Sequence, residues 1–278
     1  MSGPAIHSVM TGQKRAALLS IAELCWRGNR SENISYRAFT LIELLVVIGI
    51  IGILAAIGLP AMKGIGQANV TTAANRQMLD DLAFARLRAI SDRTTVYVVF
   101  TPTNIAKLLA SGQIRPEDRR VASNLVSRVY ASYALLSLRS VGDQPGQFTP
   151  RYLSEWKTLP DGILIPQAKF ARDLSAPRAF GSVFNYAKLP FPKARSSLAT
   201  VPCIAFNSQG QVLTGRDEFV PLVRGTIFFP RLSNGQIDLQ QAPDVQFIPP
   251  KLGSNDFQVV HLNWLTGRGR VVGPEFRQ

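Results

Sequence analysis

The sequence is poor in the residues from which catalytic and metal sites are most often built. It has two histidines, two cysteines and 18 acidic residues among 278, against 31 lysines and arginines. We find no Ser-His-Asp order, no metal-ligand spacing and no phosphate-binding glycine loop. His261 is expected to be a half-exposed strand residue, and Asp80-Asp81 a solvated or inter-subunit helix feature. We therefore expect no catalytic residue, no metal site, no cofactor and no enzymatic activity.

Cysteine is too scarce to cross-link the fold. Cys25 lies near the N-terminus, so removal of a leader would leave Cys203 alone and exclude an intrachain disulfide. Because the residues around Cys203 are apolar, we expect it to be a small buried hydrophobic residue.

The shortage of acidic residues gives the chain a net charge of +13 and a pI of about 10.3. Such a charge permits contact with nucleic acid, anionic lipid or acidic partners without selecting among them. Residues 167–200 combine basic and aromatic side chains, as single-stranded nucleic-acid sites do. We interpret them instead as a long surface insertion whose aromatic side chains pack on the core while its charges stay solvated.

In contrast, the sequence has a long apolar run that begins at Phe39 and ends at Leu59. A helix of this length rises about 30 Å, enough to cross the hydrocarbon core of a bilayer. Glu43 is the single charged residue in the run. A lone carboxylate there costs roughly 2.5–3.5 kcal/mol, so it marks a functional position that needs a cationic partner. An amine at Phe39, created by cleavage after Ala38, would supply that partner.

The stretch Arg37-Ala38-Phe39-Thr40-Leu41-Ile42-Glu43-Leu44-Leu45 resembles the N-terminus of type IV pilins and of the pseudopilins of type II secretion. The resemblance implies that a prepilin peptidase and N-methyltransferase cuts between Ala38 and Phe39 and methylates Phe39. It also implies that Glu43, fifth after the cut, acts in assembly; Ala38 stands where glycine is usual. An ordinary membrane anchor or secretory signal is the competing interpretation, which a carboxylate one turn inside the run disfavours.

These observations divide the chain into four expected parts. Residues 1–38 would form a cytoplasmic leader peptide, held on that side by its basic residues. Residues 39–62 would be the transmembrane half of a helix, and residues 63–95 its amphipathic half. Residues 96–278 would form a β-rich periplasmic globular domain. The length of the leader reflects either a function or a true start at Met10.

The expected helix has two testable features. It should continue past Pro60, since proline often kinks a helix without ending it. Between residues 67 and 92 its apolar residues recur at helical spacing, so this part should dock against a sheet. The predicted docking stripe is Val70, Ala74, Met78, Leu79, Leu82, Ala83, Leu87 and Ile90.

The remaining sequence predicts a mostly antiparallel β domain. Residues 101–128 resemble a polar loop with one short helix that begins at Pro116. The fold class is therefore predicted to be α+β, and the resemblance makes it pilin-like: a long N-terminal transmembrane and amphipathic helix packed on an antiparallel β-rich domain. The β-branched and aromatic runs that predict strands lie at residues 96–100, 129–138, 163–165, 203–206, 211–213, 219–229, 257–265 and 270–272.

Two local segments resemble the GspH and FimT branch of minor pilins. They are Ala85-Arg86-Leu87-Arg88-Ala89-Ile90 before the first strand and Phe206-Asn207-Ser208-Gln209-Gly210 in a hairpin. The resemblance implies a minor pseudopilin, a structural subunit of a type II secretion-like pseudopilus. Its partners would be the prepilin peptidase, other pseudopilins through helix packing, and inner-membrane lipid. It would cross the inner membrane once, with its C-terminal domain in the periplasm.

An alternative function rests on Gly267-Arg268-Gly269-Arg270. This stretch matches the Gly-Arg-x-Arg element with which FimT-like minor pilins bind DNA during natural transformation. Arg268 and Arg270 would contact neighbouring phosphates. Similar Thr-Gly-Arg turns are structural in secretion pseudopilins, so the sequence leaves both functions open.

Overall fold

The computed structural model describes residues 40–140, 142–144, 147–171, 183–248 and 257–273, without the side chains of residues 57–69. The predicted leader and the cleavage junction between Ala38 and Phe39 lie outside the described residues. The chain divides into two compact units, residues 1–58 and 59–278. We describe each unit by itself.

Helix α2 (Leu41–Ser91) is continuous through Pro60, as predicted. In the first unit, every described residue of this helix, from Leu41 to Ala56, exposes its side chain. Leu41 and Ile53, for example, are 81% and 65% exposed. Within the described part of the chain, no helix combines the length and apolarity needed to span a membrane.

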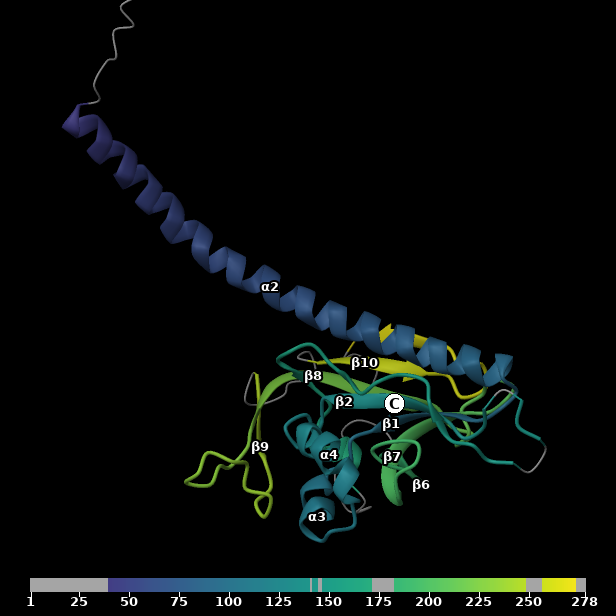
Figure 1. Cartoon of the computed structure of the whole chain (residues 1–278). Coiled ribbons are helices and arrows are strands. Elements are labelled where there is room, and N and C mark those ends of the chain that lie inside the picture. The colour runs from purple at the N-terminus through teal and green to yellow at the C-terminus, as the bar shows by residue number, and fades with distance from the viewer. Residues whose placement is uncertain (1–39, 141, 145–146, 172–182, 249–256, 274–278) are drawn as a thin grey trace, which may run out of the picture. The chain divides into compact units, whose positions relative to one another are not determined.

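The second unit contains two antiparallel sheets, which confirms the predicted α+β class (Figure 1). In the first sheet the strand order is β3-β2-β1-β7-β6, and β4 pairs with β2 beside β3. In the second sheet the order is β11-β10-β8-β5, and β9 pairs with the far end of β8. The first sheet contains β1 (Val96–Phe100), β2 (Ser132–Ser137), β3 (Arg151–Tyr152), β4 (Lys157–Thr158), β6 (Asn185–Pro190) and β7 (Leu198–Phe206). The second contains β5 (Ile163–Leu164), β8 (Glu218–Phe228), β9 (Asp244–Phe247), β10 (Phe257–Leu262) and β11 (Gly269–Val272).

Short helices cover the side of the first sheet that faces away from α2 (Figure 1). Pro116 begins the 3-10 turn η1 (Pro116–Asp118), which leads into α4 (Arg119–Val126), as predicted. Helix α3 (Ile105–Ala110) was not predicted; Ile105 and Leu109 are buried one turn apart, and six residues are too few to show a periodic pattern. Helices on one side and α2 on the other explain why every residue of β2 is buried.

The outer part of α2 docks through one face, but the predicted stripe is only partly right. Five residues on that face are fully buried: Ala74, Met78, Leu82, Ala85 and Ala89. Ala83 is exposed, and Leu87 and Ile90 are 58% and 37% exposed. The buried positions advance by four and three residues, so the contact face follows the i, i+4 ridge of the helix. Apolar residues beside that ridge remain in solvent.

A polar network also ties the outer part of α2 to the first sheet. Asp81 is buried, which corrects its prediction as a solvated or inter-subunit residue, whereas Asp80 is exposed. The Tyr133 hydroxyl of β2 donates to Asp81 Oδ2 at 2.7 Å, and Lys157 Nζ of β4 donates to Oδ1 at 2.5 Å. Gln77 donates to the Tyr133 hydroxyl at 3.0 Å. Burial, followed by the contact with Asp81, raises the pKa of Tyr133.

The core of the domain contains stacked aromatic rings and one ion pair. Phe100 stacks on Phe184 with 4.3 Å between ring centroids, and Phe170, from the turn η2 (Gln167–Phe170), meets Phe184 edge-on. Phe170, Phe184 and Phe191 of the predicted insertion are buried, as expected. The segment is not only an insertion, because it also forms β6 and the start of β7 in the first sheet. One of its charges does not stay solvated: Lys169 is buried, and its Nζ lies 3.3 Å from Glu218 Oε2.

Cys203 is a free, buried residue of β7, as predicted. Burial raises the pKa of its thiol to about 12, so the thiol stays protonated near neutral pH. The side chain therefore acts as a small hydrophobic group of the core.

Candidate functional site

The first candidate site is the start of helix α2. The Glu43 backbone N–H donates to Thr40 Oγ1 at 3.3 Å, and the Thr40 N–H donates to Glu43 Oε2 at 3.4 Å. This reciprocal pair is a capping box, in which the residue before the helix and the third helical residue satisfy each other's amides. The Glu43 carboxylate also lies in the first turn, where the helix dipole favours a negative charge.

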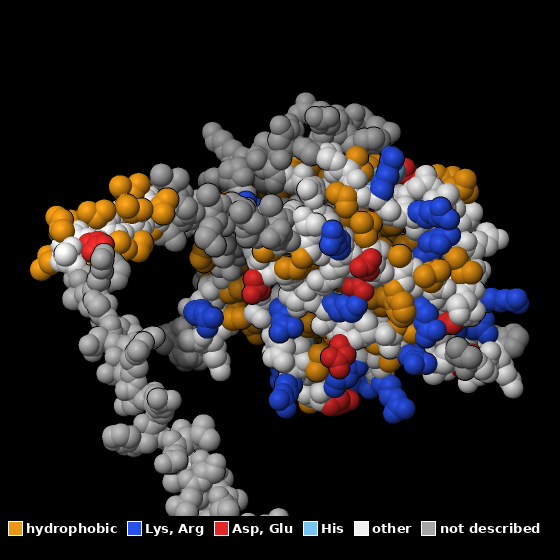
Figure 2. Space-filling model, turned by 90° about the horizontal axis from the view of Figure 1, so that it is seen from above, with side chains coloured by type: hydrophobic (Ala, Val, Ile, Leu, Met, Phe, Trp, Pro, Cys, Tyr) orange, Lys and Arg blue, Asp and Glu red, His pale blue; other side chains and the backbone are white. Residues whose placement is uncertain are grey.

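Apolar side chains surround this carboxylate on the helix surface. Figure 2 shows hydrophobic side chains covering the described start of α2. Glu43 is the only charged residue between Thr40 and Ala56, and the side chains of all these residues are exposed. The helix start therefore combines a fixed anionic group with an apolar surface that no described residue of the first unit covers.

The second candidate site is the turn between β10 and β11, residues 263–268. Asn263 Oδ1 accepts hydrogen bonds from the Thr266 backbone N–H at 2.9 Å and the Thr266 hydroxyl at 3.0 Å. The Gly267 N–H donates to the Asn263 carbonyl at 2.8 Å, and the Asn263 N–H donates to the Arg268 carbonyl at 3.0 Å. These four bonds give the turn a fixed backbone conformation.

At both glycines of the Gly-Arg-Gly-Arg stretch, neighbouring atoms leave no room for a larger side chain. Gly267 has a φ of +62°, and a Cβ there would lie 1.9 Å from the Gly210 carbonyl oxygen. A Cβ on Gly269 would lie 2.7 Å from Leu79 Cδ2 of α2. The first glycine thus lets two turns approach each other, and the second lets β11 pass close to the helix.

Arg86 of α2 holds the same turn from the helix side. Its Nε donates to the Thr266 carbonyl at 2.7 Å. Ala85 and Ala89 beside it are fully buried, because the helix lies close to the sheet at this point. The Ala-Arg-x-x-Ala-Ile segment therefore packs the helix against this turn. The Ile90 side chain of the same segment lies against Gly210.

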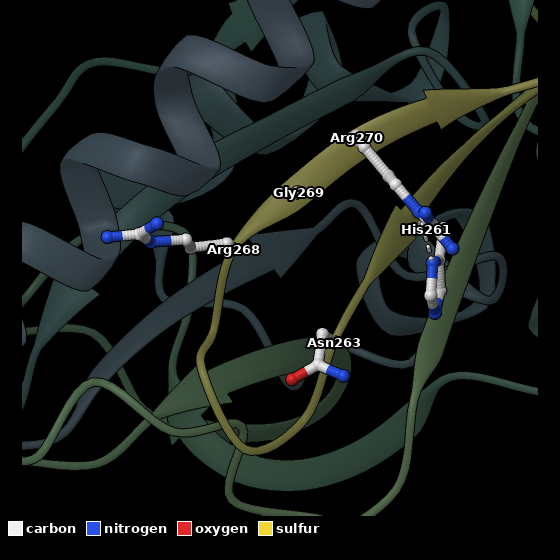
Figure 3. A pocket seen from close by; sticks show the side chains of 5 residues that line it. All are labelled: His261, Asn263, Arg268, Gly269 and Arg270. Carbon is white, nitrogen blue, oxygen red and sulfur yellow. Dashed lines mark hydrogen bonds between the residues drawn. The ribbon is translucent and has the colours of Figure 1, made fainter.

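The two arginines of the stretch have different surroundings. Figure 3 shows Arg270 reaching toward His261, whereas Arg268 points to the other side. Arg270 Nε donates to His261 Nδ1 at 3.2 Å. The Arg268 guanidinium is exposed and has no hydrogen bond or ion pair within the described residues. The two side chains therefore diverge instead of forming a single clamp.

A pocket of about 290 Å³ lies between them, lined by Arg268, Gly269, Arg270, His261 and Asn263 (Figure 3). Its side chains offer two guanidinium groups, an amide and an imidazole, which suits a small anion such as a phosphate group. Figure 2 shows other lysines and arginines spread over the drawn face of the domain, interleaved with acidic and hydrophobic side chains.

His261 is buried, not half-exposed as predicted. Its Nε2 lies 2.7 Å from Asp217 Oδ2, and its ring stacks on Phe219 with 4.8 Å between centroids. Partial burial raises the pKa of Asp217, but the Trp264 backbone N–H, His261 and Arg270 outweigh it and lower that pKa below its ordinary value. Asp217 is therefore a stable anion beside the ring.

The helix start lies within a segment that matches a known family. Residues 35–59 match the model of the prokaryotic N-terminal methylation motif. The chain carries this prepilin signal. No curated protein and no solved structure was found to match the chain. The methylation motif includes the predicted junction at Ala38 and Phe39, together with Thr40 and Glu43, so the helix start is its structurally described part.

Two features of these sites were missed in the sequence. Thr40 and Glu43 have the Thr-x-x-Glu spacing of a capping box inside the methylation motif, so a local signal for the cap was present. Asp217 is 44 residues from His261, and no local signal joins them. Arg268 and Arg270 line one pocket, and Arg270 contacts His261. Among the described residues, no cluster of three or more potential metal ligands occurs.

Proposed function

We propose that this chain is a prepilin that is cut before Phe39 and assembled as a minor pseudopilin, a structural subunit and not an enzyme. The observation that carries the proposal is the methylation motif at residues 35–59, with a capped helix that begins directly after its expected junction. In such a subunit the prepilin peptidase would release and methylate the amine of Phe39. The pseudopilus would belong to a type II secretion-like system.

The apolar surface of the helix start supports anchoring in the inner membrane. Large apolar side chains from Leu41 to Leu54 are between 44% and 81% exposed. Each would gain about 25 cal/mol per Å² of apolar surface moved from water into lipid or into a helix bundle. The helix would cross the membrane once and place the β-rich domain in the periplasm. After assembly, the same surface would pack against the helices of other pseudopilins.

The Glu43 carboxylate would fix the register of that assembly. An unpaired carboxylate is costly in an apolar bundle, whereas a carboxylate that meets the Phe39 amine of a neighbouring subunit loses much of that cost. A neighbour packed in the wrong register leaves both charges unpaired. The pairing thus favours one axial offset between helices.

The capping box allows the charge and the cap to be tested separately. Glu43→Gln keeps a side-chain oxygen that can accept the Thr40 N–H but removes the charge. Thr40→Ala removes the cap hydroxyl but keeps the charge. We expect Glu43→Gln to lose co-purification with partner pseudopilins from membranes and Thr40→Ala to retain it. Full assembly of Glu43→Gln and of Glu43→Leu would reject the register role.

A second candidate function is DNA binding at the pocket beside Arg268 and Arg270, as in FimT-like minor pilins. The supporting observation is that both arginines line one pocket on a turn whose glycines are fixed by packing. A gel shift of the purified full chain with duplex DNA tests it at several salt concentrations. We expect Arg268→Gln and Arg270→Gln each to weaken binding and reduce its salt dependence. A DNA affinity that neither substitution changes would reject this function.

A further inference from the structure

Strand β8 extends further than one of the strands that flank it. On one side, β5 pairs with residues 223–224 of β8, and the Gly225 N–H donates to the Gly162 carbonyl at 3.0 Å. On the other side, β9 pairs with residues 225–228 (Figure 1). Within the described residues, β8 beyond Gly225 therefore has a neighbouring strand on the β9 side and an open edge on the β5 side.

The alternation of hydrogen bonds decides which amides face the open edge. Successive residues of an antiparallel strand direct their N–H and C=O groups to opposite sides. The Arg224 carbonyl accepts from the Ile248 N–H beside β9 at 2.9 Å, whereas the Gly225 N–H points to the opposite side. Ile227 and Phe229 therefore face the open edge, as Gly225 does. Among the described residues, neither has a backbone partner there.

The side chains at this edge are apolar on both faces of the strand. Ile227 and Phe229 are half-buried against the core, and with Leu159 and Ile163 they line a groove of about 680 Å³. Phe228 faces the other way and is 50% exposed. A further strand at this edge would bond the open amides and cover apolar side chains on both faces.

The open edge of β8 also lacks the features that protect an edge elsewhere in the domain. Strand β6, at the edge of the first sheet, carries an exposed Lys188 and ends at Pro190. Charged residues and prolines discourage pairing with another chain. Residues 226–229 of β8 contain neither, so this edge is suited to accept a strand.

We propose that this edge pairs antiparallel with the same edge of a second copy of the chain, about a two-fold axis at Phe228. Two identical strands that pair antiparallel are related by a two-fold axis, so one edge supplies both sides of the contact. In this register Ile227 lies opposite Phe229 of the partner subunit, and the two residues exchange N–H and C=O bonds. The exposed Phe228 side chains would pack on each other across the axis.

The residues at the ends of the segment agree with this register. Pro230 would lie opposite Thr226 of the partner subunit, at a position where amides point away from the contact, so its missing N–H costs nothing. Gly162 already lies opposite Gly225, which confines the pairing to residues 226–230. After Pro230 the chain enters a separate small hairpin, in which the Asp238 N–H donates to the Pro230 carbonyl at 2.8 Å.

Cysteine cross-linking of the full chain in detergent tests this register. In a Cys25→Ser background, the remaining cysteine, Cys203, is buried. In the Phe228→Cys variant the two new thiols would lie on residues about 4.5 Å apart at Cα, within the range of a disulfide. Thr226→Cys is the matched control: it is exposed on the same face, but its two copies would lie about 13 Å apart.

Under mild oxidation, we expect Phe228→Cys to form disulfide-linked dimers at least about tenfold faster than Thr226→Cys. Copies held together through helix α2 alone would link both variants at similar rates. Equal rates, or no linked dimer in either variant, would overturn the proposed pairing.

A backbone substitution tests the hydrogen bonds of the contact. Ile227→Pro removes the N–H on the open side and takes no bond from β9, so the domain should stay folded by tryptophan fluorescence. In the Phe228→Cys chain it should slow linking about tenfold, to the rate of the control, whereas Ile227→Val should not. Equal linking with proline and valine would overturn the proposal. If the proline variant unfolds, the comparison of Phe228→Cys with Thr226→Cys decides alone.

Discussion

Two stretches of helix α2 have surfaces of opposite character. From Leu41 to Ala56 the side chains are apolar apart from Glu43, and all of them are exposed. From Val70 to Ser91 one face is buried against the β domain, and the opposite face carries exposed charged and apolar side chains. Thus the outer stretch packs on the domain of its own unit, whereas no described residue of the first unit covers the first stretch.

If the chain is the subunit proposed above, one helix serves two purposes. The outer stretch stabilises the fold through close packing and through the bonds of Asp81 and Arg86. The first stretch makes no comparable contact within its described part, and in the proposed subunit its apolar surface would serve assembly. Substitutions in the outer stretch should therefore change the stability of the domain, and substitutions in the first stretch should change assembly.

The largest expected effect is on the packed face of the outer stretch. Leu82 is 1% exposed, so Leu82→Ala should lower the free energy of unfolding of the domain by about 3–5 kcal/mol, through lost burial and a cavity. Urea denaturation of the full chain in detergent, followed by tryptophan fluorescence, measures it. Leu44→Ala is the control: Leu44 is 59% exposed, so the change should stay below about 0.5 kcal/mol. Equal losses of unfolding free energy in the two variants would show that the two stretches of α2 do not differ in their contribution to stability.

A smaller effect is expected where the β10–β11 turn meets the helix. Gly267→Ala forces a Cβ onto the Gly210 carbonyl at positive φ, and should cost about 2–3 kcal/mol in the same unfolding measurement. Gly235→Ala is matched in backbone conformation, with a φ of +80°, but its Cβ would meet nothing within 4 Å. It should cost only about 1 kcal/mol. If both variants lose the same stability, the close approach at Gly267 contributes nothing.

The smallest effect concerns the polar network under the helix, and it depends on pH. Tyr133→Phe removes the donor to Asp81 and should cost about 1 kcal/mol near pH 7. The pKa of Tyr133 in the folded state lies above its ordinary value of 10.0. The hydrogen bond of the protonated hydroxyl therefore stabilises the fold fully below pH 10, and this stabilisation is lost as the pH rises from 10 toward the folded-state pKa. The gap in unfolding free energy between wild type and Tyr133→Phe should therefore shrink above pH 10. A gap that stays constant to pH 11 or widens would contradict this assignment.

Local patterns in the sequence predicted most helices and strands of the fold. They did not predict which residues form hydrogen bonds with one another at the second site. Strand β1 and the turn at residue 116 match their predictions, because each depends on neighbouring residues. Asp81 and His261 were misjudged, since their burial depends on partners far along the chain, Tyr133 and Asp217. The helix start had a strong local signal, and even its cap was present in the sequence as Thr-x-x-Glu.

The central claim is that proteolysis converts this chain into a subunit whose first residue is Phe39. Mass spectrometry of the N-terminal peptide, on protein isolated from membranes of cells that express the full chain with a prepilin peptidase, tests it directly. The account predicts a peptide that begins at Phe39, with a methylated amine. Recovery of the uncut chain alone, or of an N-terminus beyond Leu59, would contradict it.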